Sequence, residues 1–246
     1  MRRMKWFQSL DKDFSEHLKE AAKRLAFSVV FYCAALCFCV ANTGHIFDVF
    51  TMPFRSAGFE LISLSPGDSL LAVMTMILAT AFLIAMPLVI LEITGFVMPA
   101  VKDVLQNRIR LLAIVMTALF LAGVLFAFFI ILPFFSVFVA DNGALFGIER
   151  TVSIKGYVSF VCMLSFCMGV GFEMPVLVLL LWVFGFLSSQ RLRRCREIFY
   201  LTIFAGAAVI TPPDVVSQFM VALPMIALFE IGNFCGFFMT RKLHRK

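Results

Sequence analysis

Glu173 is the residue whose type and position point most directly to chemistry. It lies inside a long apolar stretch, in the string Gly169-Val-Gly-Phe-Glu-Met-Pro175. A carboxylate at the centre of a bilayer costs about 2.5 kcal/mol or more unless it is protonated, paired or hydrated. Pro175 has no backbone N–H, so it frees a carbonyl one turn earlier, near Gly171. Two interpretations stay open: a protonated acid bonded to that carbonyl or to a neighbouring helix, or a polar anchor for another protein's segment or a water-filled cavity.

Two other acids lie within or at the end of apolar runs. Glu230 lies near Gly232 and Gly236, whose spacing is a weak indication of close helix packing. We interpret Glu230 as a structural residue near the inner membrane interface. Glu92 lies at the end of the second run, close to solvent, and a structural and a functional interpretation are equally open.

Glu20 and Asp103 are acids outside the apolar cores. Glu20 precedes Arg24 by four residues, so an ion pair along one helix is the simplest interpretation. Asp103 follows Pro99 in a short loop and by itself is an ordinary loop acid. Both lie among lysines and arginines, so they indicate only weakly a face that accepts a cationic ligand.

Enzyme motifs are absent from the sequence. We find no nucleophile elbow, no phosphate loop, no histidine-rich metal spacing and no paired intramembrane carboxylates for acid–base work. The seven cysteines are an odd number, and most lie inside apolar runs, as small residues of a lipid phase do. We therefore predict no catalytic residues, no metal and no cofactor, and we expect no nucleic-acid partner despite the net charge of +6.

The elements that position these residues are predicted to be membrane-spanning helices in one domain, residues 1–246. The apolar fraction is 62% and the charged fraction 15%, against about 45–50% and 25% in soluble domains. Runs near the spanning length of about 20 residues predict an all-α integral membrane protein with six spans, at about 25–42, 70–95, 109–139, 156–187, 197–210 and 212–238.

The distribution of basic residues predicts the orientation of the spans. Eighteen lysines and arginines lie in the two termini and the loops after spans two and four, and the alternate loops hold three. Basic residues accumulate on the cytoplasmic side of membrane proteins. Both termini are therefore predicted to be cytoplasmic.

Spans five and six are predicted to be short helices in a hairpin. The fifth apolar run, residues 198–210, has only about 13 residues and leads directly into Thr211-Pro212-Pro213-Asp214. Thr211 is predicted to cap the sixth helix, with Pro212 in its first turn and Asp214 as the acid of a capping box.

Two ordered stretches are expected outside the spans. Residues 13–24 are predicted to form a surface helix with Asp13 and Glu16 as a capping pair. Residues 43–69 combine apolar residues with prolines and glycines, a pattern that predicts short helical pieces at the outer side.

Several strings together resemble the TatC family, the multispanning core subunit of the twin-arginine protein translocase. The similarity covers nearly the whole chain. Its motifs are Gly171-Phe-Glu-Met-Pro175, Thr211-Pro-Pro-Asp-x-x-Ser-Gln218, Leu223-Pro224, Leu228-Phe-Glu-Ile-Gly232, His17-Leu-Lys-Glu20 with Arg24-Leu25, Phe96 with Pro99, and the single prolines Pro53 and Pro87.

The resemblance implies export of folded proteins, driven by the proton-motive force, across the cytoplasmic (inner) membrane of a prokaryote. It implies a concave helical bundle in the lipid bilayer, within a multimeric complex that includes TatA- and TatB-type single-span partners and binds twin-arginine precursor proteins. The signal-peptide-binding residues it implies are Glu20, Phe96 and, as the nearest loop carboxylate, Asp103. It also implies an intramembrane and partner-contact set (Glu173, Asp214 and Gln218) and a set of structural prolines (Pro53, Pro87, Pro175, Pro212 and Pro213).

The sequence departs from the family pattern at two positions. Ala22 stands where the amino-terminal motif has its first arginine, and Leu105 stands where the family has its loop acid. A guanidinium needs carboxylate partners to offset its desolvation, so a displaced acid implies a weaker or rearranged arginine site. The alternative to this function is a small-molecule or ion secondary transporter with a mid-membrane glutamate site.

Overall fold

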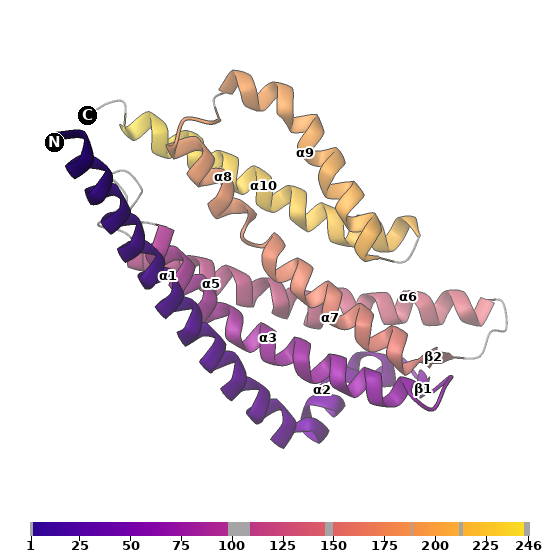
Figure 1. Ribbon diagram of the computed structural model, residues 1–246. Coiled ribbons are helices and arrows are strands. Elements are labelled where there is room, and N and C mark those ends of the chain that lie inside the picture. Colours follow the sequence, from indigo (N-terminus) through magenta and orange to yellow (C-terminus); the bar gives the residue numbers. More distant parts are fainter. Residues whose placement is uncertain (1, 98–108, 146–149, 188, 212–213, 244–246) are drawn as a thin grey trace. The chain divides into compact units, whose positions relative to one another are not determined.

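The structure, a computed structural model, describes residues 2–97, 109–145, 150–187, 189–211 and 214–243. Nearly all of these residues are helical (Figure 1). The helices are α1 (Arg2–Ala41), α2 (Thr43–Ser56), α3 (Asp68–Val97), α5 (Ile109–Phe126), α6 (Leu132–Leu145), α7 (Ile154–Gly171), α8 (Met174–Val183), α9 (Ser189–Ile210) and α10 (Val215–Leu243). A π-helical turn, η2 (Ala127–Ile131), joins α5 to α6, and the strands are β1 (Glu60–Ile62) and β2 (Thr151–Ser153).

Five helical segments within the described residues are long and apolar enough to cross a membrane. They are Lys19–Ala41, Asp68–Gly95, Leu111–Ala144, Ile154–Val183 and Val215–Arg241. This confirms a helical, multi-pass membrane protein. The remaining predicted span, in α9, is not among them: the basic residues at 191–196 occupy the first part of the helix, and the apolar run that follows is short. The sixth span and the orientation of the termini therefore stay predictions.

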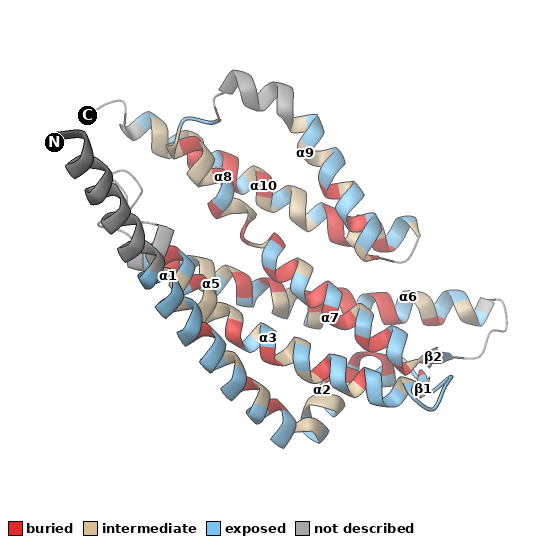
Figure 2. Ribbon diagram, viewed as in Figure 1, coloured by how far each residue is buried: buried red, intermediate tan, exposed pale blue. Residues whose placement is uncertain are grey.

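The surfaces of these helices are suited to lipid. From Lys19 onward α1 is mostly exposed (Figure 2), yet many of its exposed side chains are large and apolar, such as Leu25, Val30 and Phe38. In water this surface would carry a large unfavourable hydration free energy. Hydrocarbon tails remove that cost, so the exposed apolar faces are the lipid-facing ones.

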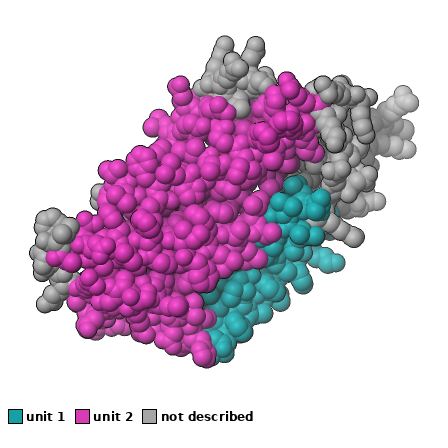
Figure 3. Space-filling model, turned by 180° about the vertical axis from the view of Figure 1, so that it is seen from behind, with its two compact units in different colours: residues 1–42, 77–117 teal, residues 43–76, 118–246 magenta. Residues whose placement is uncertain are grey.

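The chain divides into two compact units (Figure 3). The first consists of residues 1–42 and 77–117, and the second of residues 43–76 and 118–246. In the first unit α1 packs on α3: the hydroxyl of Tyr32 donates to the carbonyl of Leu78 over 3.4 Å. The Tyr32 ring also meets Phe82 edge-on, with centroids 6.3 Å apart.

An aromatic cluster organises one end of the second unit. The ring of Phe54 lies 4.4 Å from that of Tyr157 and 4.9 Å from that of Phe59, measured between centroids. The Tyr157 hydroxyl donates a 2.5 Å hydrogen bond to the carbonyl of Phe50. Pro53 is buried in the same helix, α2. A helical piece predicted within residues 43–69 is therefore present as α2.

Beside this cluster, β1 and β2 pair as parallel strands, with Glu60 opposite Thr151 and Ile62 opposite Ser153. Arg150 reinforces the pairing by donating from Nη1 to the carbonyl of Ala57 over 3.0 Å. These contacts hold the segment after α2 against the segment before α7.

The third span contains the π-helical turn η2, which ends two residues before Pro133. In a regular helix the proline ring clashes with the carbonyl four residues earlier, here that of Phe129. A wider turn relieves this clash. The chain thus continues as one apolar span, Leu111–Ala144.

Close backbone contact joins α8 to α10. A Cβ added to Gly232 would lie 2.7 Å from the Cα of Pro175 and 2.9 Å from its carbonyl oxygen. A Cβ on Gly236 would lie 2.5 Å from the ring of Trp182. The Trp182 indole also donates to Asn233 over 3.3 Å. The Gly232–Gly236 spacing therefore marks a true close approach between helices.

The turn between α9 and α10 corrects one prediction. The backbone N–H of Ser217 donates to Asp214 Oδ2 over 2.7 Å, so Asp214 caps α10. Thr211 instead donates to the carbonyl of Ala207 at the end of α9. Both residue types cap helices, and α10 begins at Val215, which leaves Asp214 at the capping position. Pro212 and Pro213 lie outside the described residues.

Helix lengths differ from the predictions in two places. α9 and α10 contain 22 and 29 residues, so they are not short helices. The polar residues before the apolar run of α9 are good helix formers and extend it. Likewise α1 runs unbroken from Arg2 to Ala41 instead of beginning with a separate surface helix, because this stretch contains no glycine or proline.

Candidate functional site

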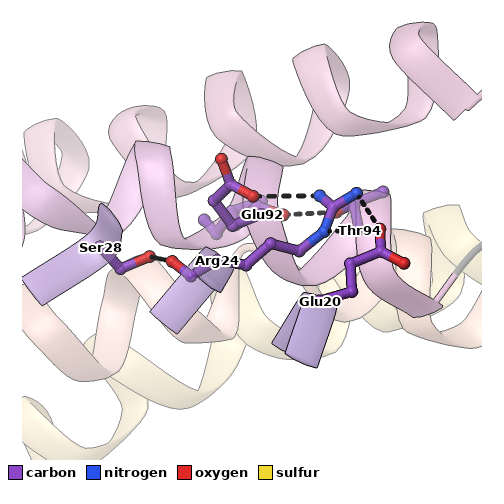
Figure 4. Close-up of polar contacts among 6 residues, drawn as sticks. Glu20, Arg24, Ser28, Glu92 and Thr94 are labelled. Atoms are coloured by element: carbon purple, nitrogen blue, oxygen red, sulfur yellow. Dashed lines mark hydrogen bonds and ion pairs between the residues drawn. The ribbon is translucent and has the colours of Figure 1, made fainter. Parts of the chain in front are cut away.

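An arginine held between two glutamates is the most polar arrangement among the side chains that the structure describes in the first unit. The Arg24 guanidinium donates from Nη2 and Nε to Glu20 Oε1, over 2.8 and 3.2 Å. Its Nη1 donates to Glu92 Oε2 over 3.0 Å (Figure 4). Hydrogen bonds between ionised partners are about twice as strong as neutral ones. We call Glu20, Arg24 and Glu92 the carboxylate clamp.

Local helix geometry positions each member of the clamp. Glu20 and Arg24 lie four residues apart on α1, where side chains share one face. Glu92 comes from α3, close to its carboxyl end. Gly95 allows the approach, because a Cβ there would lie 2.6 Å from Arg24 Nη1. Ser28 donates to the Arg24 carbonyl over 3.1 Å, which orders the α1 turn that follows.

The clamp is accessible. The side chains of Arg24, Glu20 and Glu92 are 30%, 49% and 25% exposed. Exposed ion pairs contribute only about 0–1 kcal/mol each, so these contacts open at little cost. Among the described residues, Glu20 Oε2 and Glu92 Oε1 accept no hydrogen bond. Each carboxylate thus has one oxygen to which no described residue donates.

Two hollows flank the Arg24 side chain. One, of about 630 Å³, is lined mainly by apolar residues of α1 and α3 (Ala21, Leu25, Val29, Phe82, Ala85 and Val89) together with Arg24 and Glu92. The other, of about 680 Å³, is lined by Glu20, Lys23, Arg24, Glu92 and apolar residues. Both carboxylates are therefore reachable from outside the protein.

The predicted signal-binding residues are only partly placed by the structure. Glu20 belongs to the clamp, and Phe96 lies in α3, four residues after Glu92. Asp103 and Leu105 lie outside the described residues. Sequence analysis left the role of Glu92 open and predicted no partner for it. The available signal was its position near the end of the second predicted span, four residues before Phe96.

Glu173 lies in the second unit, at a break in the fourth span. Phe172 and Glu173 separate α7 from α8, and Pro175 follows in the first turn of α8. The residue is 7% exposed. Both of its carboxylate oxygens are buried, and neither has a hydrogen-bond partner among the described residues. Among the described residues, Glu173 therefore makes neither of the bonds of the first interpretation, to the freed carbonyl or to a neighbouring helix.

Both carboxylate oxygens of Glu230, by contrast, accept a hydrogen bond. Arg196 donates to its Oε2 over 2.7 Å, and the Tyr200 hydroxyl donates to its Oε1 over 2.5 Å. These bonds tie α9 to α10, in agreement with a structural role. Gln218 adds another tie, because its side-chain amide donates to the carbonyl of Phe204 over 3.0 Å.

Comparison with known proteins gives consistent matches along the chain. The family model described as Sec-independent protein translocase protein (TatC) matches residues 16–224. The chain is 31% identical over 231 residues to the Sec-independent protein translocase protein TatC of Aquifex aeolicus, covering 93% of this chain and 96% of that protein. It is 30% identical over 231 residues to the protein of the same name from Escherichia coli K12, covering 92% and 88%.

A solved structure is also similar. The crystal structure titled Twin Arginine Translocase Receptor TatC superposes with a TM-score of 0.81 at 30% identity. The match covers 91% of this chain and 99% of that one.

Proposed function

The chain belongs to the TatC family of Sec-independent protein translocase proteins, and from this membership we propose that it is the signal-recognising membrane subunit of a twin-arginine translocase. Proteins of this family are translocase components and not enzymes, which confirms that expectation. The family match leaves the alternative, a secondary transporter, without support.

The observation that carries the proposal is the carboxylate clamp. A twin-arginine signal presents guanidinium groups, and Glu20 already binds one guanidinium through two N–H donors. The planar fork of arginine matches a carboxylate in a way that the ammonium of lysine does not. Glu20 and Phe96, with Asp103 in the adjoining loop, form the signal-binding patch of this proposal.

The clamp also supports the proposed topology. The first candidate span begins at Lys19 in α1, and the second candidate span ends at Gly95 in α3. The contact between Arg24 and Glu92 requires those two ends to lie on the same side of the membrane. With basic residues concentrated in the termini, that side is the cytoplasm. A single membrane domain, with α9 as the sixth span, then places both termini there.

The intramembrane site of the proposal is Glu173. A buried acid without a partner is costly, and a polar group of another membrane helix would remove that cost. We assign Glu173 to contact with a TatA- or TatB-type single-span partner, and Asp214 and Gln218 to the turn that shapes the outer end of this region. The complex would lie in the inner membrane of a prokaryote and use the proton-motive force.

A co-purification experiment tests the proposal. The tagged, detergent-solubilised protein is incubated with a precursor carrying a twin-arginine signal, and with the same precursor carrying two lysines instead. The arginine precursor is expected to be recovered in clear excess. Equal recovery of both precursors refutes signal recognition, although the fold would stand.

A further inference from the structure

Arg24 occupies the position that a ligand's arginine would need. Its guanidinium uses three N–H donors on two carboxylates from different helices. The clamp thus already contains a bound guanidinium, supplied by the chain itself. The geometry shows which group this site holds best, because a planar fork satisfies both glutamates at once.

Glu92 supplies the second carboxylate of the site. The family resemblance places a loop acid where this chain has Leu105. A loss of one acid from a two-acid site would leave a cationic ligand half-paired. Glu92 Oε2 lies 3.0 Å from Arg24 Nη1, so α3 provides from a helix what the loop position lacks. A carboxylate on a helix is also held more precisely than one on a loop.

The ion pairs of Arg24 are weak enough for another guanidinium to replace Arg24. Its ion pairs are partly exposed, and such pairs contribute little free energy. An incoming guanidinium would restore the same hydrogen bonds, so exchange leaves no carboxylate unpaired. The hollows on both sides of Arg24 provide room for an arriving side chain and for the displaced one.

We propose that Glu20 and Glu92 form a guanidinium site that Arg24 fills in the resting protein, and that an arginine of the signal peptide takes over the site by displacing Arg24. The inference rests on the proposed function and adds to it a residue, Glu92, and a regulatory step, self-occupation. Arg24 then acts as a competitor that any cation must outbind. A lysine signal competes poorly, because its ammonium lacks the fork.

Self-occupation has a measurable consequence. When only a fraction of the protein has a free site, the apparent affinity falls by that fraction. If Arg24 fills about nine sites in ten, its removal tightens signal binding about 10-fold. A purely structural Arg24, which only joins α1 to α3, predicts the opposite sign, since its removal would loosen the site.

The test compares binding of a fluorescent twin-arginine signal peptide and its twin-lysine counterpart to the purified full-length protein. Arg24→Gln is expected to bind the arginine peptide about 3- to 10-fold more tightly than the wild type. Glu92→Gln is expected to bind it at least about 10-fold more weakly and to lose most of its preference over lysine.

Two further variants control the experiment. Arg55→Gln removes an arginine whose pair, Asp48 at 3.5 Å, is exposed and belongs to the other unit; it should bind like the wild type. Arg24→Lys keeps the charge without the fork and should fall between the wild type and Arg24→Gln, so it replaces Arg24→Gln if that variant does not fold. Thermal stability in detergent verifies folding.

The outcomes separate the two hypotheses. A wild type that binds both peptides equally refutes the proposed function. A wild type that prefers arginine, with Glu92→Gln unchanged, refutes the inference alone. Unchanged or weaker binding by a folded Arg24→Gln or Arg24→Lys also overturns self-occupation. The double variant Arg24→Gln/Glu92→Gln should not regain tight binding; if it does, Glu92 is not part of the site.

Discussion

The contact between α8 and α10 can be tested by adding one methyl group. In Gly232→Ala the new Cβ would lie 2.7 Å from the Cα of Pro175 and 2.9 Å from its carbonyl oxygen. Both atoms are backbone, and Val178 is 3.0 Å away on the same helix. Relief therefore requires the two helices to separate. Because a rotamer change cannot remove the clash, we expect α8 to lose its packing on α10.

The expected magnitude comes from comparison with a matched glycine. Gly206→Ala, in α9, adds the same methyl group where nothing lies within 4 Å, so the helix-propensity gain of about 1 kcal/mol is common to both variants. Overpacking costs about 1–3 kcal/mol. Because the clashing atoms belong to the backbone, we expect a cost in the upper half of this range. Gly232→Ala should therefore be about 2–3 kcal/mol less stable than Gly206→Ala. At about 2–4 °C per kcal/mol this is a Tm difference of about 4–12 °C.

The assay is thermal unfolding in detergent. Each purified variant is heated, and the fraction that still elutes as folded protein in size-exclusion chromatography gives the apparent Tm. Circular dichroism at the starting temperature verifies that both variants are folded. A difference below about 2 °C between the two variants would refute the close approach of Gly232 to Pro175 and the tight α8–α10 packing inferred from it.

Three further predictions concern single hydrogen bonds and the buried acid. Tyr157→Phe leaves the buried carbonyl of Phe50 without its donor and should lower the free energy of unfolding by about 1–3 kcal/mol. Tyr32→Phe, which loses an exposed 3.4 Å bond, should cost less than about 0.5 kcal/mol, and equal effects would contradict the buried contact. Asp214→Ala removes the α10 cap and should cost about 0.5–2 kcal/mol, whereas Asp214→Asn retains most of the stability; denaturation of both variants decides. Glu173→Ala should keep the yield and Tm of the wild type while reducing crosslinking to single-span partners, and loss of the protein itself would instead indicate a structural role.

The sequence predicted the spans and the local pairs well, because these depend on short-range patterns. Apolar length alone identifies all five candidate spans, and no end differs from the predicted one by more than six residues. The four-residue spacing likewise predicts the pair of Glu20 and Arg24. Patterns of this kind follow from helix geometry and need no knowledge of the tertiary fold.

Contacts between residues far apart in the chain could not be predicted from the sequence. Glu92 meets Arg24 over a separation of 68 residues, which depends on the register of two antiparallel helices. The capping residue of α10 was assigned to Thr211 because threonine and aspartate are both strong caps. Only the observed start of the helix at Val215 distinguishes between them.

The break at Phe172 and Glu173 has a consequence for how the fourth span packs. The segment before it is anchored at α5, where a Cβ on Gly123 would lie 2.4 Å from the carbonyl oxygen of Met168. The segment after it is anchored at α10 through Pro175. The two halves of the fourth span are therefore packed on different helices, α7 on α5 and α8 on α10. The buried carboxyl of Glu173 lies at the joint between them.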